Sequence, residues 1–321
     1  MVKKRVVVIG GGTGTYQVLV GLKKNKNLNI SAVVAMSDSG GSTGRLRQEF
    51  GMFPPGDLRR ALLALSSLPI NEKTLERLFD FRFENGKELK GHSLGNIFLA
   101  ALTQITGTPE KAIAEAQKIL AVSGQVLPVT LDDTHLAAIL EDGTEVFGET
   151  NIDVRSIKPD VPIKKVFLKP QANVFPQAKE AIEAADLIVL GPGDLYTSII
   201  PSLLVNGVTD AIAKSRAKLV FVINIMTKPG ETDGYSTSRF VTAIKEYLGE
   251  AHDRLAYVLV NKGSNLGGSL SWYREFEAEP VFDDLPSGAN GRRLLKNHEA
   301  EGEFSVIRRN FVKNGAEKPH F

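Results

Sequence analysis

Short apolar runs recur along the chain and alternate with amphipathic stretches. Residues 6–9 lack polar alternation, as in a strand that is buried on both faces, and residues 15–24 carry apolar side chains at helical spacing. Further strand-like runs are residues 30–36, 187–190, 219–225 and 257–260. Because helical stretches separate these runs, the pattern predicts an α/β fold of three layers, with a mostly parallel, Rossmann-like sheet covered by helices.

The remaining segments predict additions to this sheet. Residues 57–122 are dominated by helical periodicity and predict a helical subregion that forms a cap or side layer. Residues 128–148 alternate and turn near Asp142, which predicts an antiparallel hairpin insertion. We expect residues 161–173 to form a crossover segment and residues 304–311 an edge strand. The whole chain, residues 1–321, is predicted to be a single α/β nucleotide-binding domain.

Composition and charge exclude several kinds of protein. The formal net charge of +2 gives no reason to expect a nucleic-acid partner. The chain has no cysteine, so disulfides, thiolate nucleophiles and thiolate metal sites are absent. The five histidines form no closely spaced pair, which argues against zinc but leaves carboxylate-bound Mg²⁺ open. The first apolar run ends at Ile9, too early for a membrane span, so we expect a cytoplasmic protein.

The richest motif is the glycine loop that follows the first predicted strand. It reads GGGTG and consists of Gly10, Gly11, Gly12, Thr13 and Gly14. Glycine tolerates positive φ and lets a ligand approach the backbone, while the free N–H groups of the next helix attract an anion. The motif therefore predicts a phosphate-binding turn, although a tight turn without a ligand would use similar residues.

This loop does not specify which phosphate compound binds. Read as a dinucleotide fingerprint, it has Gly10 and Gly12 but places Thr15 where glycine or alanine allows close helix packing. No Gly-Lys-Ser/Thr follows, so it is not a P-loop. An NAD-linked dehydrogenase stays an alternative on this partial match, and NAD could also occupy the site adventitiously.

Polar and mostly glycine-rich loops also follow the other predicted strands, where ligands of parallel sheets bind. Asp38 follows the second strand, at the place of a ribose-binding acid, and Arg45 and Arg47 behind it are either phosphate donors or surface arginines. An aromatic ring could stack on a base, although core packing is favoured for Trp272. Besides the glycine loop, the predicted nucleotide contacts are Asp38, Arg45, Gly191, Gly193, Asp194, Asn224, Lys228 and Tyr273.

Four side chains are candidates for chemistry: Asp38, Asp57, His92 and Asn96. Asp57 and Asp194 share the string Pro-Gly-Asp-Leu before a helical pattern, so both are expected to be helix N-caps, with a ribose or metal contact as a compatible second role. Asp38 and Asp57 are the candidate Mg²⁺ ligands. No nucleophile elbow surrounds Ser93, so His92 is expected to position a ligand, or merely to cap or pack, rather than to activate a nucleophile.

Six motifs, in this order, resemble those of one bacterial family: GGGTG, SDSGGSTGRLR, PPGDLRRAL, HSLGN, GPGDLYTSIIP and NIMTKPGETDGY. The family is the gluconeogenesis factor group (YvcK/GlmR), which is related to CofD, the 2-phospho-L-lactate transferase of deazaflavin cofactor biosynthesis. The resemblance implies that residues 11–14 and 191–194 hold a nucleoside diphosphate compound, with Asp38, Asp57 and Asn96 facing the reacting or sensed group.

The resemblance implies two alternative functions. In the regulator branch the protein binds a UDP-sugar such as UDP-N-acetylglucosamine without turnover and needs no cofactor. It then supports gluconeogenic growth, carbon allocation to cell-wall precursors and cell shape, acting with a protein partner and as a homodimer. In the CofD-like branch it is a Mg²⁺-dependent phospholactyl or phosphoryl transferase that uses a guanosine diphosphate derivative. The NIMTKPGETDGY motif favours the regulator.

Overall fold

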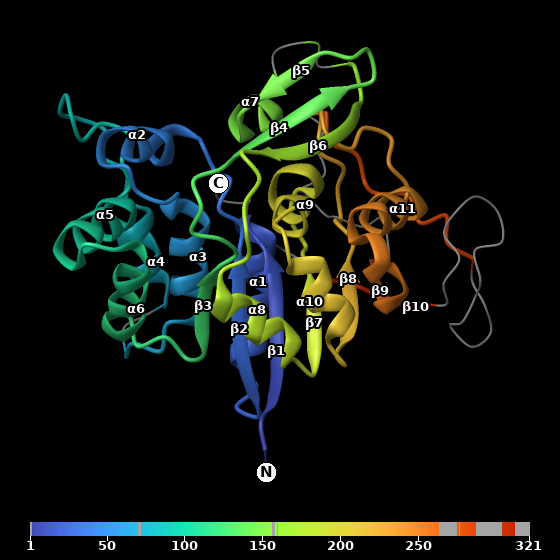
Figure 1. The fold of residues 1–321 in the computed structure, drawn as a ribbon, viewed down its shortest axis with the longest axis horizontal. Helices are drawn as coiled ribbons and strands as arrows, with labels where there is room; N and C mark the ends of the chain where they lie inside the picture. The colour runs from blue at the N-terminus through green and yellow to red at the C-terminus, as the bar shows by residue number, and fades with distance from the viewer. Residues whose placement is uncertain are drawn as a thin grey trace.

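The main sheet has seven parallel strands in the order β10-β9-β8-β7-β1-β2-β3 (Figure 1). This is a computed structural model, which describes residues 2–69, 72–155, 158, 160–262, 275, 277–286 and 304–311. The strands are β1 (Lys4–Gly10), β2 (Leu28–Val34), β3 (Gln125–Pro128), β7 (Leu187–Leu190), β8 (Lys218–Val222), β9 (Leu255–Asn261) and β10 (Ser305–Arg309). The predicted parallel sheet is confirmed, as is the edge strand near the C-terminus.

The strand order reverses between β1 and β7. From β1 the chain proceeds to β2 and β3 on one side, and from β7 it proceeds to β8, β9 and β10 on the other. Because crossovers between parallel strands are right-handed, the two halves place their connecting helices on opposite faces. These helices are α1 (Gly12–Lys23), α8 (Pro176–Glu183), η1 (Leu195–Ile199), α9 (Ile200–Leu203), α10 (Val208–Lys214), α11 (Thr237–Leu248) and η2 (Gly249–Arg254). Ligands of such sheets bind where the order reverses, beyond the carboxyl ends of the strands.

Local sequence explains the two elements beside this reversal. In β1 the side chains of residues 6–9 are buried, because the strand lies at the centre of the sheet with helices on both faces. Helix α1 begins at Gly12 rather than at Thr15 as expected. Gly12, Thr13 and Gly14 therefore form the first helical turn, so their amides belong to a helix N-terminus rather than to a preceding loop.

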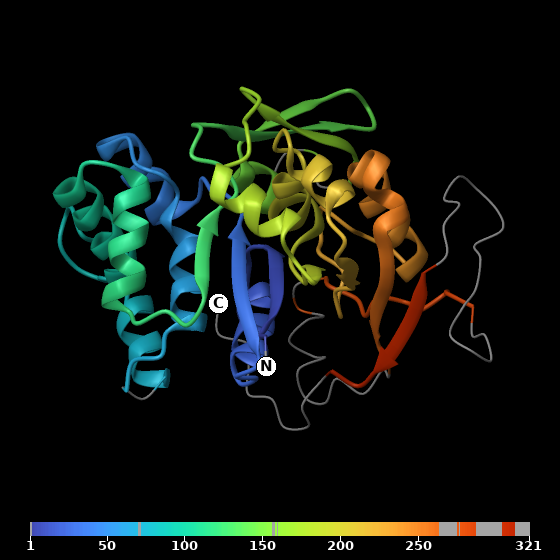
Figure 2. The same cartoon turned by 60° about the horizontal axis from the view of Figure 1, so that its bottom comes forward.

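The predicted helical subregion is confirmed and forms one end of the molecule (Figures 1 and 2). It contains α3 (Pro55–Leu65), α4 (Glu72–Asp80), α5 (Leu94–Thr106) and α6 (Pro109–Ile119), and α2 (Gly41–Phe50) lies beside them. Helix α3 packs against α1 and next to β3, which joins the subregion to the sheet. Among the described residues, no helix combines the length and apolar character needed to cross a membrane.

A second, antiparallel sheet lies beyond the carboxyl ends of the parallel strands (Figure 1). Its strands β4 (His135–Leu140) and β5 (Glu145–Phe147) form the predicted hairpin, and α7 (Glu149–Asp153) follows. The crossover predicted for residues 161–173 is wrong in its central part, because β6 (Ile163–Lys169) pairs with β4 as a third strand. Its buried residues Ile163, Val166 and Leu168 stand among exposed lysines, as expected for a strand with one buried face.

Candidate functional site

The loops after β1 and β7 meet at the strand-order reversal. A Cβ atom on Gly14 would lie 2.5 Å from the carbonyl oxygen of Pro192, so a side chain at position 14 would push α1 away from the second loop. Thr15 donates a hydrogen bond through Oγ1 to the same carbonyl oxygen at 3.3 Å. The close packing that the dinucleotide fingerprint assigns to position 15 therefore occurs at Gly14.

Asp57 caps a neighbouring helix rather than its own, which corrects the sequence prediction. Helix α3 has Pro54 at its N-cap, and Asp57 lies inside its first turn. The amide of Gly12, at the start of α1, donates to Asp57 Oδ1 at 2.9 Å. Asp194 does stand at the N-cap position of η1, but its side chain forms no capping hydrogen bond. Both carboxylates instead point into the space beyond the strands, where they line one cavity.

This cavity has a volume of about 420 Å³. Acidic, basic and small polar residues line it, and most come from the first turns of helices. They are Asp38, Gly40, Gly41, Ser42, Thr43, Gly56, Asp57, Arg59, Arg60, Arg82, Asn96, Glu149, Asp153, Asp194, Thr197 and Ser198. The structure thus brings together the predicted residues Asp38, Asp57, Asn96 and Asp194.

One group of acids in the cavity forms no ion pair within the described part of the chain, and the Arg60 guanidinium opposes but does not cancel the rise in the pKa of Asp57. Burial raises the pKa of Asp57 to about 6, and the nearby charge of Asp38 adds to the shift. Burial also raises the pKa of Glu149 to about 8, again with help from Asp38. Within the described part of the chain, none of these three carboxylates forms an ion pair with lysine or arginine. We call Asp38, Asp57 and Glu149 the unpaired acid group.

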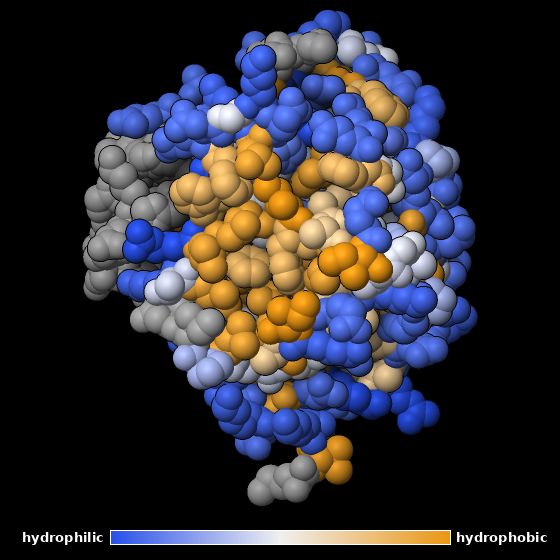
Figure 3. Space-filling model, turned by 90° about the vertical axis from the view of Figure 1, so that its left-hand side faces the viewer, coloured by the Kyte–Doolittle hydropathy of each residue, from blue (hydrophilic) through white to orange (hydrophobic). Residues whose placement is uncertain are grey.

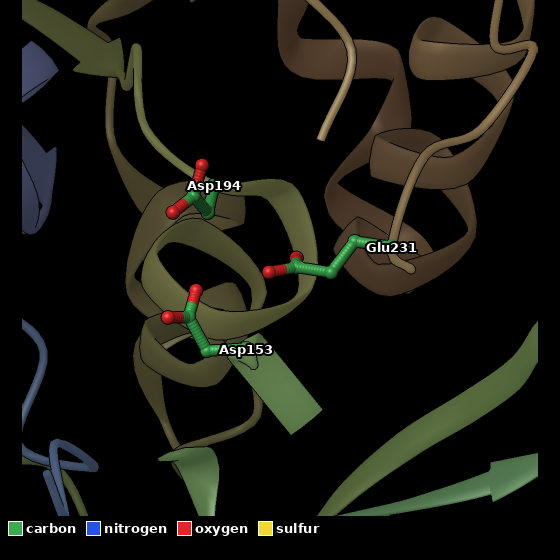
Figure 4. A group of neighbouring side chains, drawn as sticks. All are labelled: Asp153, Asp194 and Glu231. Atoms are coloured by element: carbon green, nitrogen blue, oxygen red, sulfur yellow. The ribbon is translucent and has the colours of Figure 1, made fainter. Parts of the chain in front are cut away.

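A second group of acids is paired with a cation. One carboxyl oxygen from each of Asp153, Asp194 and Glu231 lies within 4.8 Å of the others, and the three side chains come together from separate segments (Figure 4). The Lys228 ammonium lies 2.9 Å from Asp153 Oδ1 and 3.5 Å from Asp194 Oδ2. Glu231 accepts hydrogen bonds from an amide and a hydroxyl of η1, and burial raises its pKa well above the ordinary value. We call these four residues the lysine-paired acid group.

The same cavity also offers groups that attract anions. The first turns of α2 and α3 contribute lining residues, and their first amides lack intrahelical partners. The first turn of α1 lies next to the lining, because the Gly12 amide donates to Asp57. The lining does not include the predicted contacts Gly10, Gly11, Gly12, Thr13, Gly14, Gly191 and Gly193. Arg60 donates to Thr13 Oγ1 at 2.8 Å, so its guanidinium lies beside the glycine loop. Arg59 is buried and pairs with Asp80 at 2.9 Å. The cavity therefore combines carboxylates with helix N-termini and arginines.

His92 lies outside the residues that line the cavity, although Asn96 lies within them. The His92 Nδ1 and Ser42 Oγ atoms are 2.9 Å apart, and Asn96 Nδ2 donates to the same hydroxyl at 3.2 Å. Burial, and secondarily the charge of Arg45, lowers the pKa of His92. His92 thus supports Ser42 from behind, which agrees with positioning rather than with acid–base chemistry. Asn96 Oδ1 is buried without a partner among the described residues.

Several other predicted contacts lie away from the cavity lining. Arg45 Nη2 donates to the carbonyl of Lys90 at 2.6 Å. Arg47 donates to the carbonyl of Asp38 at 3.2 Å and pairs with Asp133, so it fixes the loop that carries Asp38. Asn224 follows β8 but is not among the lining residues. Trp272 and Tyr273 fall outside the described residues.

Sequence reasoning missed five charged side chains of the cavity, which are Arg59, Arg60, Arg82, Glu149 and Asp153. Arg60 stands three residues after Asp57 in the first helical turns of α3, so helical spacing could have placed it on the same side of α3, facing the cavity. Glu149 and Asp153 come from α7, behind the hairpin. Nothing in their local sequence shows that the insertion folds back over the parallel strands, so only the tertiary structure reveals them.

Comparison with known proteins agrees with this architecture. Residues 6–299 match the family model described as 2-phospho-L-lactate transferase CofD. The gluconeogenesis factor of Halalkalibacterium halodurans is 48% identical over 98% of this chain and 95% of its own length. That of Bacillus subtilis is 41% identical over 95% of this chain and 94% of its own. The chain belongs to the gluconeogenesis factor family. The family predicted from the six motifs is therefore confirmed.

Other members of the gluconeogenesis factor family differ in length. A relative from Nostoc is 46% identical over 95% of this chain, which spans only 66% of that protein. A crystal structure of a UPF0052 family member from Bacillus halodurans superposes with a TM-score of 0.80 and 44% identity, covering 88% of each chain. The fold described above is thus shared with a solved relative.

Proposed function

We propose that this gluconeogenesis factor binds a nucleoside diphosphate sugar of the UDP-N-acetylglucosamine type, together with Mg²⁺, and acts as a regulator without turnover. One observation carries the proposal. The cavity at the strand-order reversal contains both an unpaired acid group and anion-attracting helix N-termini with arginines. Acids alone would suit a cation and N-termini alone would suit a phosphate, whereas a metal-bound diphosphate supplies both partners.

The donor set fits Mg²⁺. This ion prefers hard oxygen ligands and is usually held by one or two carboxylates together with the phosphates of a nucleotide. Asp38 and Asp57 are the carboxylates that we assign to this role. A Cβ atom on Gly56 would lie 2.4 Å from Asp38 Oδ2, and one on Gly11 would lie 2.1 Å from Asp57 Oδ2. Both carboxylates therefore pack against glycine backbone, where any side chain would displace them.

A regulatory role is favoured over catalysis by the placement of His92. This candidate acid–base group bonds with Ser42 and does not line the cavity. Relatives at 41–48% identity are named gluconeogenesis factors, which supports a role in gluconeogenic growth. We infer that sensing of the nucleotide sugar adjusts the allocation of carbon to cell-wall precursors, and thereby cell shape, through a cytoplasmic protein partner.

A CofD-like transferase is the second candidate function. The match to the CofD family model covers every residue that lines the cavity. Phosphoryl transfer needs positioning and charge stabilisation rather than a protein nucleophile, so Asp38 and Asp57 with Mg²⁺ would suffice. The NAD alternative is less favoured. It rests on the partial fingerprint alone, which places Thr15 where glycine or alanine is usual.

Calorimetric titration tests the ligand. We expect UDP-N-acetylglucosamine to bind more tightly with Mg²⁺ than with a chelator, and more tightly than GDP or NAD. Asp57→Asn keeps an oxygen for the Gly12 amide but removes the charge, so it should weaken Mg²⁺-dependent binding by roughly 10- to 100-fold. Asp186→Asn is the matched control, because Asp186 lies at the opposite end of the sheet. Equal binding with and without Mg²⁺ would contradict the assignment of the metal.

Phosphorus NMR of the bound nucleotide separates the two functions. We expect the resonances of the diphosphate to persist for hours at stoichiometric protein and Mg²⁺. Release of a nucleoside monophosphate, or transfer to an added hydroxy acid, would favour the transferase. Loss of that turnover in Asp57→Asn, with the fold preserved, would then place the reaction in this cavity.

A further inference from the structure

The two edges of the parallel sheet differ in charge. Acids gather at the carboxyl ends of the strands, in the two groups described above. The described segments that lead into β1, β2, β3, β7, β8 and β9 lie at the opposite edge, and they are residues 2–5, 22–29, 118–126, 182–188, 213–219 and 247–256. These six segments carry eleven lysines and arginines but only four aspartates and glutamates. Because the whole chain has 39 cations and 37 acids, the positive charge is local to this edge.

Structural roles account for five of the eleven cations. Three stand in the last turns of α1, α6 and α10, where a positive charge complements the helix dipole. The Nε atom of Arg5 lies 3.7 Å from a carboxyl oxygen of Asp186, and Arg254 donates to backbone carbonyl groups. The other six are exposed and form no ion pair with an acid within the described residues. We call them the basic edge, and they are Lys3, Lys4, Lys24, Lys26, Arg216 and Lys218.

The residues of the basic edge lie close together. The amide of Lys4 donates to the carbonyl of Asn27 at 3.0 Å, so the turn between α1 and β2, with Lys24 and Lys26, adjoins the start of β1. Lys218 opens β8, and only β7 separates β8 from β1. Since neighbouring strands lie about 4.8 Å apart, the backbones of the two strand starts are within roughly 10–15 Å of each other. The strands begin at the end of the molecule that carries the N-terminus (Figure 1), and that end is mostly hydrophilic (Figure 3).

The local backbone favours a flat anionic surface over a nucleic acid as the partner. Helices α1, α8 and α10 end at this edge, and the carbonyl groups of helix C-termini repel phosphates that approach the backbone closely. Lysine side chains extend beyond the backbone, so their ammonium groups suit a layer of negative charge that stays outside. Single-stranded nucleic acids stack their bases on exposed aromatic rings. The one aromatic residue of the six segments, Tyr247, instead accepts a hydrogen bond from the amide of Val166.

We propose that the basic edge docks the protein on a lipid bilayer that contains anionic phospholipids. Clusters of four to eight lysines and arginines are typical of proteins that bind such membranes through charge, and the basic edge has six. Val2 is 97% exposed beside these cations and adds an apolar side chain at the depth of the lipid headgroups. The contact is peripheral and requires no membrane-spanning helix.

The opposite charges of the two sheet edges fix the orientation of the docked protein. An anionic surface attracts the basic edge and repels the acids at the carboxyl ends of the strands. The cavity and the antiparallel sheet therefore face away from the bilayer (Figure 1), where a ligand or a protein partner reaches them. Docking through the basic edge does not require a ligand in the cavity, so it is independent of the proposed function.

Flotation of the full chain with vesicles tests the docking. At about 50 mM salt the wild-type protein should float with phosphatidylcholine vesicles that contain about 30% phosphatidylglycerol, and it should dissociate at about 500 mM salt because screening weakens the attraction. Vesicles of phosphatidylcholine alone should bind at least about ten-fold less protein. Absence of binding to the anionic vesicles at low salt, or equal binding to both kinds of vesicle, would overturn the proposal.

Paired substitutions locate the contact. Lys24→Gln combined with Lys26→Gln removes two charges from the basic edge and should lower the partition coefficient onto anionic vesicles by roughly 20- to 30-fold, or about five-fold for each charge. Lys87→Gln combined with Lys90→Gln is the matched control, because it changes the net charge equally in an exposed loop before α5. The control should float like the wild type, and both variants should keep the wild-type circular dichroism. Equal losses in the two variants would contradict docking through the basic edge.

A fluorescent label reports which end of the protein meets the bilayer. Because the chain has no cysteine, Val2→Cys and Asn85→Cys each introduce a single attachment site for a polarity-sensitive fluorophore. On anionic vesicles the emission of the label at position 2 should shift to the blue, whereas the emission of the label at position 85 should not. The reverse result would contradict the orientation. Tighter binding to single-stranded RNA than to the vesicles, at equal phosphate concentration, would overturn the proposal in favour of a nucleic acid.

Discussion

Two groups of acids contribute side chains to one cavity, all three of the unpaired acid group and Asp153 and Asp194 of the lysine-paired acid group, and they differ in how their charge is balanced. The lysine-paired acid group has the Lys228 ammonium between Asp153 and Asp194. The unpaired acid group forms no such ion pair among the described residues, and burial raises the pKa of Asp57 to about 6 and that of Glu149 to about 8. Proximity of carboxylates alone would favour the first group as a metal site, since its oxygens lie within 4.8 Å of one another.

The difference shows that carboxylates without an ion-paired lysine or arginine identify a cation site better than the clustering of carboxylates does. A metal ion entering the lysine-paired group would have to displace Lys228, whose own pKa those acids raise. A metal ion entering the unpaired group displaces only protons. The unpaired group also adjoins the N-termini of α1 and α3, which favour the phosphates of a nucleotide. We therefore place Mg²⁺ and the diphosphate there.

The largest expected effect concerns pH. The folded-state pKa of Glu149 is raised to about 8 from an ordinary 4.5, so the folded protein binds a proton that the unfolded chain releases in this window. Stability of the metal-free protein should therefore fall as pH rises from 5 to 8, by roughly 2–4 kcal/mol from this group. Glu149→Gln resembles the protonated form and should remove that part of the slope in urea unfolding. If Glu149→Gln left the slope of stability against pH unchanged, the pKa of Glu149 would not be raised in the folded protein.

Removal of Lys228 should convert the paired group into a second unpaired one. Lys228→Met leaves Asp153 and Asp194 facing each other and should lower the free energy of unfolding at pH 8 by about 1–3 kcal/mol. Millimolar Mg²⁺ should restore most of this loss. Lys169→Met is the control, because Lys169 pairs with Glu145 at 3.5 Å on the surface and should change stability little. If Mg²⁺ did not restore the stability of Lys228→Met, the absence of a paired cation would not by itself make a group of acids a metal site.

The smallest expected effect on stability comes from the close packing between the start of α1 and the loop after β7. Gly14→Ala places a Cβ atom 2.5 Å from the Pro192 carbonyl and should cost about 1–2 kcal/mol by separating α1 from the second loop. Gly21→Ala lies in the same helix, where nothing approaches within 4 Å, and should stabilise by about 0.5–1 kcal/mol. Thermal unfolding of the two variants measures the contrast. Similar shifts in both would indicate that the loops are not held by close packing.

Sequence patterns predicted the parallel sheet because each strand is a continuous apolar run with its own flanking helix. They failed for β3, which is only four residues long and follows the helical subregion directly, and for β6, whose apolar residues stand among exposed lysines. The cavity was predicted in part: Asp38 and Asp57 follow from their places after strands and before helices. Glu149 was not predicted, because its role depends on how an insertion folds back in space. The capping of α1 by Asp57 is likewise a long-range contact that local propensity does not encode.

Paramagnetic resonance with Mn²⁺ in place of Mg²⁺ tests the central claim most directly. With UDP present, the wild-type protein should bind Mn²⁺ at a site that Asp57→Asn and Asp38→Asn each weaken strongly. Asp153→Asn should leave that affinity nearly unchanged, because Lys228 already occupies the second group. Mn²⁺ binding that resists Asp57→Asn and disappears in Asp153→Asn would contradict the account and move the metal to the lysine-paired acid group.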